Sequence, residues 1–579
     1  MHIKTSLDQE LFLRAVAERD KGNHYEALSL FHKVLESAPK RIDVHIQIGL
    51  LYLNTKDLKN AQVFFEKALT LHPDFFEPYF YLAFVHHQKR EFDLAINWYS
   101  KALLYKEDQF EIHANLGGIY LEISQFERAI LSYERALLIE PSSIYALNLL
   151  ATSLININRL DEARTYLAKS LAREPLNPQS LYLLGIIHKR KDLIKEAIEC
   201  FSLTLRTNQD HFEALFNRAE CYSALHEYDL AIKDFERAAI EANNIKESTP
   251  RYMYLSEWNL AQIYLKLGDY LRGWRLYENR FHIKSLNNPR LFADKPLMTS
   301  LEVANKVVLV YAEQGYGDVI QFCRYLLLLK ERCRKIVFLV PKSLVELMEM
   351  LSDDIIVIHG FPSFDDIDLQ VPLLSLPMLF NTQVATIPKI ESYLRPNDLY
   401  MKKWGQILGE KNKTRIGFIC TSGKNTQSGT VRDVPVKIFS ALFSFPFEFH
   451  LLQLEMDQQD KDHLSLYDNV ICHVGNICDF SDTAAIISHM DLVISVDTGP
   501  AHLAAAIGKP VWIMLPIHAD FRWMLNRRDS LWYKTVTLFR QQKANDWSEV
   551  ISSVAKQLYE MLCKTARVPM DFRDSCLIE

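Results

Sequence analysis

The residues best suited to chemistry lie in the stretch "DLVISVDTGPAHLAAAIGKPVWIML", where an apolar run ends at Asp497 and an alanine-rich helix is predicted to follow. Thr498, Gly499 and Pro500 form the turn between them. Proline is favoured in the first turn of a helix, where its missing N–H costs nothing. Free N–H groups and the helix dipole attract anions at such an end. The pattern predicts a phosphate site with His502 nearby, and the alternative is an ordinary strand-to-helix turn.

A polar loop, "TSGKNTQSGTVRD", follows the apolar run "RIGFIC" and carries Lys424 and Arg432. Basic groups at the carboxyl end of a strand can neutralise a diphosphate, whereas either one alone would be an unremarkable surface charge. Because the predicted anion-binding helix belongs to the same region, we expect at least one of the two to contact the same anion.

The stretch "VVLVYAEQGYGD" places Gly315 and Gly317 after another apolar run, with Asp318 at the start of a predicted helix. A dinucleotide-binding loop would read G-x-G-x-x-G with an acid about 20 residues further on. Ile320 occupies the third glycine position, which disfavours a nicotinamide cofactor. The Asp318 carboxylate can accept a proton from a hydroxyl, although an acid here also stabilises a helix start. We group Gln321 with the two glycines as part of this cleft turn.

Short apolar runs alternate with predicted helices around these motifs, which is typical of a parallel sheet with crossover helices. The first set comprises strands "VVLVYA", "KIVFLV" and "DIIVIHG", with helices "DVIQFCRYLLLLKERC" and "KSLVELMEML" between them. The second set comprises "RIGFIC", "FEFHLLQLE", "NVICHVG", helix "DTAAIISHM", "DLVISVD", helix "GPAHLAAAIG" and "PVWIMLP". We expect two Rossmann-like lobes, at 306–398 and 399–565, with a cleft at the carboxyl ends of both sheets. A tail follows at 566–579.

The first half of the chain repeats with a period of 34 residues. Alanine recurs in this register seven times, at Ala27, Ala61, Ala95, Ala129, Ala163, Ala197 and Ala231. A small residue lies twelve positions before each, and a bulky residue lies four positions after it. Pro39, Pro73, Pro141 and Pro175 lie twelve positions after, where a helix must stop. The pattern predicts antiparallel helix pairs and closely resembles the tetratricopeptide repeat.

The array is predicted to span residues 8–286 in about eight repeats, with an eight-residue insertion after Ile240 and a modified last unit that contains Ala261 and Gly273. Stacked repeats of this kind form a superhelix whose concave face binds peptide or protein. The polar segment at 287–305, which carries two prolines, is predicted to be a linker to the first lobe.

Composition excludes several classes of function. The 579 residues carry a formal net charge of −6, which does not predict a nucleic-acid partner. The nine cysteines are scattered without a CxxC pair, so neither a zinc site nor a disulfide framework is indicated, and we expect reduced thiols in a cytoplasmic protein. No apolar stretch reaches the roughly 20 residues that a membrane helix needs. The segment "DDID" at Asp365–Asp368 contains an Asp-x-Asp of the kind that some enzymes use to bind a metal, but it is predicted to be a solvated loop.

Taken with "GYGD", the stretch "SVDTGPAHLAAAIGKPVWIML" resembles the heptosyltransferase-type glycosyltransferases of family 9, which have a GT-B fold. The whole chain is similar to bacterial tetratricopeptide-repeat proteins that carry such a domain at the C-terminus. The segments "GWRLYENRF", "DLQVPLLSLPMLF", "DFRWMLNRRDSLWYKTVTLFRQ" and the "DW" at residues 546–547 also resemble that group.

The resemblance implies an inverting transferase that uses a nucleotide sugar as substrate and needs neither a cofactor nor a metal for binding it. It implies that Asp318 is the catalytic base and that Thr498 and Gly499 bind the diphosphate. It further implies that Asp497 and His502 contact sugar or phosphate. The lysine that the family has three residues before a proline is Arg432 here. This departure keeps the positive charge but changes how a phosphate would be held.

Two functions follow from these patterns. The first is transfer of a sugar from a nucleotide-sugar donor to a hydroxyl of a protein or glycan, with the array recruiting the acceptor or a partner. The second is a non-catalytic scaffold in which a degenerate transferase domain is retained for binding. The joint presence of the motif residues favours the first.

Overall fold

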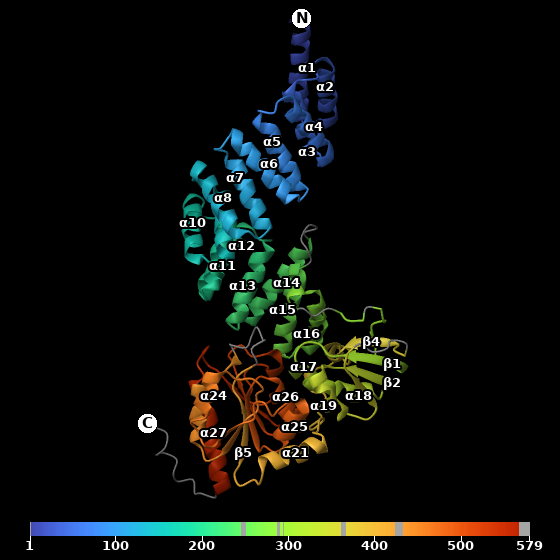
Figure 1. The fold of residues 1–579 in the computed structure, drawn as a ribbon, viewed down its shortest axis with the longest axis vertical. Helices are drawn as coiled ribbons and strands as arrows, with labels where there is room; N and C mark the ends of the chain where they lie inside the picture. Colours follow the sequence, from blue (N-terminus) through green and yellow to red (C-terminus); the bar gives the residue numbers. More distant parts are fainter. Residues whose placement is uncertain are drawn as a thin grey trace. The chain divides into compact units, whose positions relative to one another are not determined.

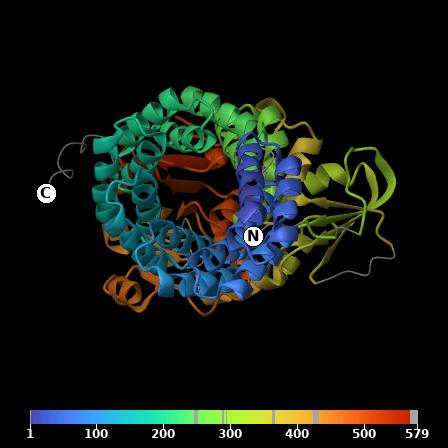
Figure 2. The same cartoon turned by 90° about the horizontal axis from the view of Figure 1, so that it is seen from above.

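The computed structural model describes residues 2–244, 251–286, 290–292, 294–360, 366–422 and 432–566. The chain divides into two compact units, Met1–Cys221 and Tyr222–Glu579. Within the first unit, helices follow one another along the sequence in antiparallel pairs and trace a curve (Figures 1 and 2). The fold is therefore a tetratricopeptide-repeat superhelix followed by an α/β region that is consistent with a GT-B domain.

Thirteen helices begin in the first unit. Their bounds are α1 (His2–Asp20), α2 (His24–Ser37), α3 (Ile42–Asn54), α4 (Leu58–Leu71), α5 (Phe76–Gln88), α6 (Phe92–Tyr105), α7 (Phe110–Glu122), α8 (Phe126–Ile139), α9 (Ile144–Asn156), α10 (Leu160–Arg173), α11 (Pro178–Arg190), α12 (Ile194–Thr207) and α13 (Phe212–Ala224). Helices α2, α4, α8 and α10 each end two residues before a proline of the predicted stop position, which confirms that prediction.

The small and bulky positions of the repeat pack on each other within one helix pair. A methyl group added to Gly49 would come within 2.5 Å of the Phe65 ring, and one added to Gly117 within 2.7 Å of the Tyr133 ring. Rings of the second helix therefore occupy the space that glycine leaves on the first. These contacts lie inside one repeat unit, between its two helices.

The second unit continues the array with α14 (Tyr228–Asn244), α15 (Arg251–Leu267) and α16 (Tyr270–Tyr277), followed by the short 3-10 helices η1 (Glu278–His282) and η2 (Lys284–Leu286). Ala261, Leu265, Tyr270, Trp274 and Tyr277 are buried in the same hydrophobic core as both sheets. The last helix pair therefore packs as a part of the α/β region.

The first lobe is a four-stranded parallel sheet in the order β3-β2-β1-β4. Its strands are β1 (Val303–Tyr311), β2 (Cys333–Leu339), β3 (Ile355–Ile358) and β4 (Leu369–Pro372). Its helices are α17 (Tyr316–Phe322), η3 (Cys323–Tyr325), α18 (Leu326–Leu329), η4 (Lys342–Leu344), α19 (Val345–Glu349), η5 (Leu373–Ser375), α20 (Leu376–Leu379) and η6 (Val384–Thr386). Helix α21 (Asp398–Leu408) leads to the second lobe.

The second lobe is a six-stranded parallel sheet in the order β10-β9-β8-β5-β6-β7. Its strands are β5 (Arg415–Ile419), β6 (Glu448–Leu451), β7 (Val470–Cys472), β8 (Leu492–Val496), β9 (Val511–Leu515) and β10 (Val536–Arg540). Its helices are α23 (Val436–Phe439), η7 (Ser440–Ser444), α24 (Gln458–Leu464), α25 (Phe480–Ser488), α26 (Gly499–Ile507), η8 (Phe521–Trp523) and α27 (Ser548–Ala566).

Three local predictions differ from the structure. The helix predicted from Asp318 to Cys333 is divided into α17, η3 and α18, and it ends at Leu329. The middle segment is a 3-10 turn that contains the buried Arg324. Strands β4 and β10 were not predicted. Each is the last named strand of its sheet, and its outer side carries only an isolated bridge, Leu297–Gln370 for β4 and Asp529–Thr537 for β10. Strand β1 begins at Val303, inside the predicted linker, because it pairs with β2 from that residue. No described helix is both long and apolar enough to cross a membrane.

Candidate active site

The turn after β8 presents the start of α26 at the carboxyl end of the second sheet. All five residues of β8 are buried, and Thr498 takes an extended conformation that ends the strand. Its hydroxyl contacts Ser495 Oγ at 3.1 Å and donates to the Val496 carbonyl at 3.3 Å, so it does not cap α26. The Gly499 N–H donates to no acceptor among the residues that the structure describes. An anion could therefore accept from it.

Asp497 and His502 form a buried pair behind this turn. Asp497 Oδ1 lies 3.3 Å from His502 Nε2, and His502 Nδ1 lies 3.0 Å from the Tyr533 hydroxyl. The His502 ring stacks on Trp523 at 5.4 Å. Burial by itself raises the pKa of the Asp497 carboxyl, but hydrogen bonding to His502 and the charges of His502 and Arg522 outweigh it. The pKa of Asp497 therefore lies well below its usual value, and the group is a carboxylate at neutral pH.

Asp318 lies in the first turn of α17, after β1 of the first lobe. Its Oδ2 accepts a hydrogen bond from the Gly315 N–H at 3.0 Å, which satisfies the backbone donor that precedes the helix. A methyl group on Gly317 would come within 2.8 Å of His502 Cδ2. Only glycine therefore allows α17 to approach α26 this closely, and the carboxylate of one lobe lies beside the helix start of the other.

Arg522 joins the two lobes at this point and was not recognised from the sequence. Its Nη2 donates to Asp318 Oδ1 at 2.6 Å, and its Nη1 lies 3.4 Å from His502 Nε2. Burial lowers the pKa of the guanidinium, but attraction to Asp520, Asp318 and Asp497 dominates and raises it. Arg522 lies within the segment "DFRWMLNRRDSLWYKTVTLFRQ", so the resemblance marked the region without marking the residue.

Of the two predicted basic residues, Arg432 reaches the site. Its Nη1 donates to the Asp497 carbonyl at 3.3 Å and lies 3.8 Å from Asp497 Oδ2. Lys424 lies outside the described residues. Pro500 occupies the first turn of α26, as predicted. Tyr316 lies against Gly499, since a methyl group added to Gly499 would be 3.6 Å from Tyr316 Cβ. The structure thus brings Asp318, Arg432 and the Asp497–His502 motif together.

Gln321 does not line the turn. Its side chain is fully buried, and neither its Oε1 nor its Nε2 has a hydrogen-bond partner among the described residues. Gln321 lies on the buried face of α17. Beside it, the Arg324 side chain donates to the Gln321 carbonyl at 2.8 Å and to the Trp532 carbonyl at 2.7 Å. Arg324, which was also missed, therefore ties the first lobe to the second from inside.

The acidic segment at Asp366–Asp368 serves the first sheet. Asp368 accepts from the Val307 N–H at 2.7 Å and pairs with Lys306 at 3.5 Å. Asp365, the first residue of "DDID", is outside the described residues. In the described part of the chain, no cluster of three or more His, Cys, Asp or Glu side chains could hold a metal ion.

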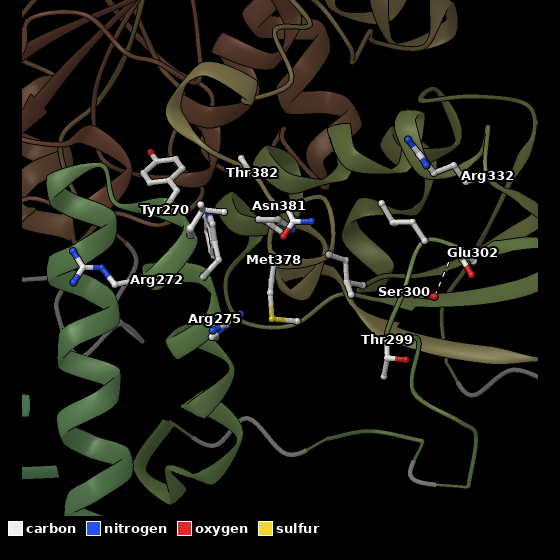
Figure 3. Close-up of a pocket in the computed structure, with 15 residues that line it drawn as sticks. Tyr270, Arg272, Arg275, Thr299, Ser300, Glu302, Arg332, Met378, Asn381 and Thr382 are labelled. Carbon is white, nitrogen blue, oxygen red and sulfur yellow. Dashed lines mark hydrogen bonds between the residues drawn. The ribbon is translucent and has the colours of Figure 1, made fainter. Parts of the chain in front are cut away.

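A cavity of about 830 Å³ lies at a different place from these residues (Figure 3). Thr299–Glu302, which precede β1, form one wall, and α16 forms another. Asp318 follows the opposite end of the same strand. Tyr270 and Met378 belong to the lining, with Arg275 and Arg332 on either side of Met378 in Figure 3. The cavity is therefore not part of the Asp318–His502 cluster.

Comparison with known proteins identifies two kinds of region. The sequence model of glycosyltransferase family 9 (heptosyltransferase) matches residues 467–514. Three tetratricopeptide-repeat models match residues 42–75, 120–187 and 190–244. The family 9 match contains β8 and the motif from Asp497 to His502, whereas Asp318 lies outside it.

The relatives differ in how much of the chain they cover. The protein FlbA of Caulobacter vibrioides is 24% identical over 436 residues, which are 71% of this chain and 72% of FlbA. Two solved structures are similar to the repeats alone. A tetratricopeptide repeat protein from Parabacteroides merdae is 17% identical with a TM-score of 0.37, over 43% of this chain and 98% of its own. The MamA protein is 23% identical with a TM-score of 0.28, over 30% of this chain and 94% of its own.

Proposed function

We propose that this chain, in which tetratricopeptide repeats precede a glycosyltransferase family 9 domain, is an inverting, metal-independent glycosyltransferase. It moves a sugar from a nucleotide-sugar donor to a hydroxyl of a protein or glycan acceptor. The observation that carries the proposal is the meeting of Asp318 with the start of α26, where Gly317 approaches His502 across the lobe boundary. A base and an anion site on opposite lobes are what displacement at an anomeric carbon requires.

The donor diphosphate would lie on the start of α26. The Gly499 N–H is available at this end, and the helix dipole favours negative charge there. The Thr498 hydroxyl, which donates to the Val496 carbonyl, would have to turn to contact the same anion. Arg432, held by the Asp497 carbonyl, adds a positive charge beside it, and Lys424 is a second candidate. Charge grows on the phosphate oxygen as the sugar–phosphate bond breaks, and fixed dipoles and cations stabilise that charge most.

Asp318 would act as the general base. It takes the proton of the acceptor hydroxyl, whose oxygen attacks the anomeric carbon on the face opposite the leaving group. The bond between that carbon and the phosphate oxygen breaks, and its electron pair leaves with the nucleoside diphosphate. Each carboxylate oxygen of Asp318 already accepts one hydrogen bond, from Gly315 or from Arg522, so the acceptor hydroxyl must use a remaining lone pair.

The tetratricopeptide repeats would recruit the acceptor or a partner protein. Arrays of this type bind through their concave face. The first lobe contributes a small sheet of four strands, so we assign acceptor recognition to the repeats.

The test uses the full chain, a panel of nucleotide sugars and the variant Asp318→Asn. We expect hydrolysis or transfer from one donor, insensitive to a metal chelator. The variant should lose about 10²–10⁴-fold in kcat, which is the usual contribution of a general base. Its affinity for the nucleoside diphosphate, measured by calorimetry, should be unchanged. Arg432→Ala should instead weaken that affinity. Unaltered turnover in Asp318→Asn would refute the assignment of the base.

The alternative, a non-catalytic scaffold, has one observation in its favour. The Asp318 carboxylate is paired with Arg522 at 2.6 Å, as a purely structural ion pair between the lobes would be. The two functions differ in a simple outcome. A scaffold would turn over no donor in the panel, while its repeats would still capture a partner.

A further inference from the structure

Helix α16 contacts both elements that carry the Asp318–Arg522 pair. Trp274 is fully buried in α16, and its ring meets Phe322 of α17 and Phe521 of η8, each at 5.6 Å and nearly edge-on. Phe322 ends the helix that begins beside Asp318, and Phe521 directly precedes Arg522. Figure 1 shows α16 and α17 as neighbours. The Trp274 side chain therefore lies between α17 and η8.

Tyr277, one turn further along α16, makes the same bridge with a hydrogen bond. Its hydroxyl donates to Gln314 Oε1 at 3.0 Å, and its ring meets Phe521 at 6.0 Å. Tyr277 is 2% exposed, whereas Gln314 is exposed, so the hydrogen bond is shielded from water on the Tyr277 side. Gln314 immediately precedes the capping residue Gly315 and has a φ of 61°, a left-handed conformation that a non-glycine residue adopts only when its surroundings hold it.

The residue before Gln314 is fixed by the same part of the array. Arg280 of η1 is fully buried and binds Glu313 with two parallel hydrogen bonds, of 2.9 and 2.7 Å. Glu313 also accepts from the Leu374 N–H at 3.2 Å. Tyr277 and Arg280 of the array thus hold the turn at Gln314 and Glu313, and Arg522 of the second lobe holds it at Asp318. Asp318 Oδ2, bonded to the Gly315 N–H, moves with that turn.

We infer that Tyr277 is a positioning residue for the reaction: α16 fixes where Asp318 lies relative to Arg522. The inference rests on the proposed function, because it concerns the base of that reaction. It assigns to the last helix pair of the repeat array a role inside the catalytic domain. Tyr277 touches no substrate and acts through Gln314 and Phe521.

The variant Tyr277→Phe removes the hydroxyl and keeps the ring. We expect the amide of Gly315 to exchange its hydrogen about fivefold faster, since one intramolecular hydrogen bond contributes about that factor to stability. In the turnover assay kcat should fall by a similar factor, while KM for the donor and the affinity for nucleoside diphosphate stay unchanged. Arg275→Ala on the exposed side of α16, labelled in Figure 3, is the matched control and should alter neither.

A second variant keeps the inference testable if Tyr277→Phe fails to fold. Gln314→Met removes the acceptor of the same hydrogen bond from an exposed residue. It should reproduce the faster exchange, and the double variant should be no worse than either single one, because the two lose one shared bond. Additive effects, or unchanged exchange at Gly315 in both variants, would overturn the inference.

The two proposals fail in different ways. If Asp318→Asn retains full turnover, the base assignment is wrong, whatever the exchange data give. If Asp318→Asn is inactive while Tyr277→Phe exchanges and turns over as the unaltered protein does, the proposed function stands and the role of Tyr277 falls. Hydrogen exchange needs no substrate, so it reports on Tyr277 even without a known donor.

Discussion

Asp318 fits both interpretations that its position in the sequence allowed. Its Oδ2 caps α17 through the Gly315 N–H, and its Oδ1 faces Arg522 of the other lobe. An asparagine side chain keeps a carbonyl oxygen for the cap but cannot take a proton. Asp318→Asn therefore separates capping from basicity, whereas Asp318→Ala would remove both.

His473 gives a pH prediction at the same scale. It is 3% exposed and stacks on His450, and burial with that neighbour lowers its pKa from 6.5 to about 4. Between those values the unfolded chain binds a proton that the folded chain does not. The free energy of unfolding should therefore fall as the pH drops from 6.5 to 4, by about 3 kcal/mol from this residue.

The variant His473→Gln cannot titrate in that range. Chemical denaturation at several pH values should show a shallower acid dependence than in the unaltered protein, and His359→Gln, at an exposed site, should leave the dependence as it was. The prediction fails if His473→Gln and the unaltered protein lose the same free energy between pH 6.5 and 4.

At the scale of the helix pair, two adjacent glycines in α7 should respond in opposite ways. A methyl group on Gly117 would meet the Tyr133 ring at 2.7 Å, but one on Gly118 has only the Tyr133 hydroxyl, at 3.8 Å. Gly117→Ala should destabilise the array by about 1–3 kcal/mol through overpacking. Gly118→Ala should stabilise it by about 0.5–1 kcal/mol, since alanine favours a helix. Thermal unfolding measures both, and equal effects would contradict the packing argument.

The turns inside the pairs repeat a left-handed residue with a φ near 60°, occupied among others by Lys56, Ser124 and Asn158. For residues other than glycine this conformation costs about 1–2 kcal/mol of conformational free energy, and for asparagine it costs less. Ser124→Gly should therefore raise the free energy of unfolding by about 1 kcal/mol, and Asn158→Gly by less. A larger gain at Asn158 in urea titrations would count against this explanation.

At the scale of the molecule, the pair Arg280–Glu313 joins the last helix pair to the first sheet without contact with water. Burial lowers the pKa of Arg280, but the Glu313 and Glu278 carboxylates outweigh it and raise that pKa, so the guanidinium stays charged. Arg280→Met leaves Glu313 buried without its partner and should cost about 3–5 kcal/mol of unfolding free energy. Arg280→Met with Glu313→Gln should recover most of that, because the fully buried carboxylate is removed and Glu278, the other partner of Arg280, keeps some contact with water.

Calorimetry or denaturant unfolding of the full chain can compare the three proteins. Lys330→Met, which breaks the exposed pair with Asp354, serves as the surface control and should change stability by less than about 1 kcal/mol. A double variant as unstable as Arg280→Met would show that packing, and not the unpaired charge, determines the loss.

The sequence alone determined the elements that depend on short-range periodicity. The 34-residue register predicted the helix pairs, and alternation predicted most strands, because both depend on neighbours within one element. It also marked Asp318 and the turn from Asp497 to His502. Strands β4 and β10 escaped because each lies in a segment without the alternation of strand and helix that revealed the other strands, and only pairing with β1 or β9 makes it extended.

Only the tertiary structure decided which of these residues meet. Arg522 and Asp318 are 204 positions apart, and Arg324 reaches Trp532 across 208. Tyr277 and Gln314 are likewise distant in sequence. No periodicity records such pairs, since a contact of this kind depends on how two sheets and a helix pack. The sequence supplied the charged and aromatic groups, and the packing of α16 between α17 and η8 set their geometry.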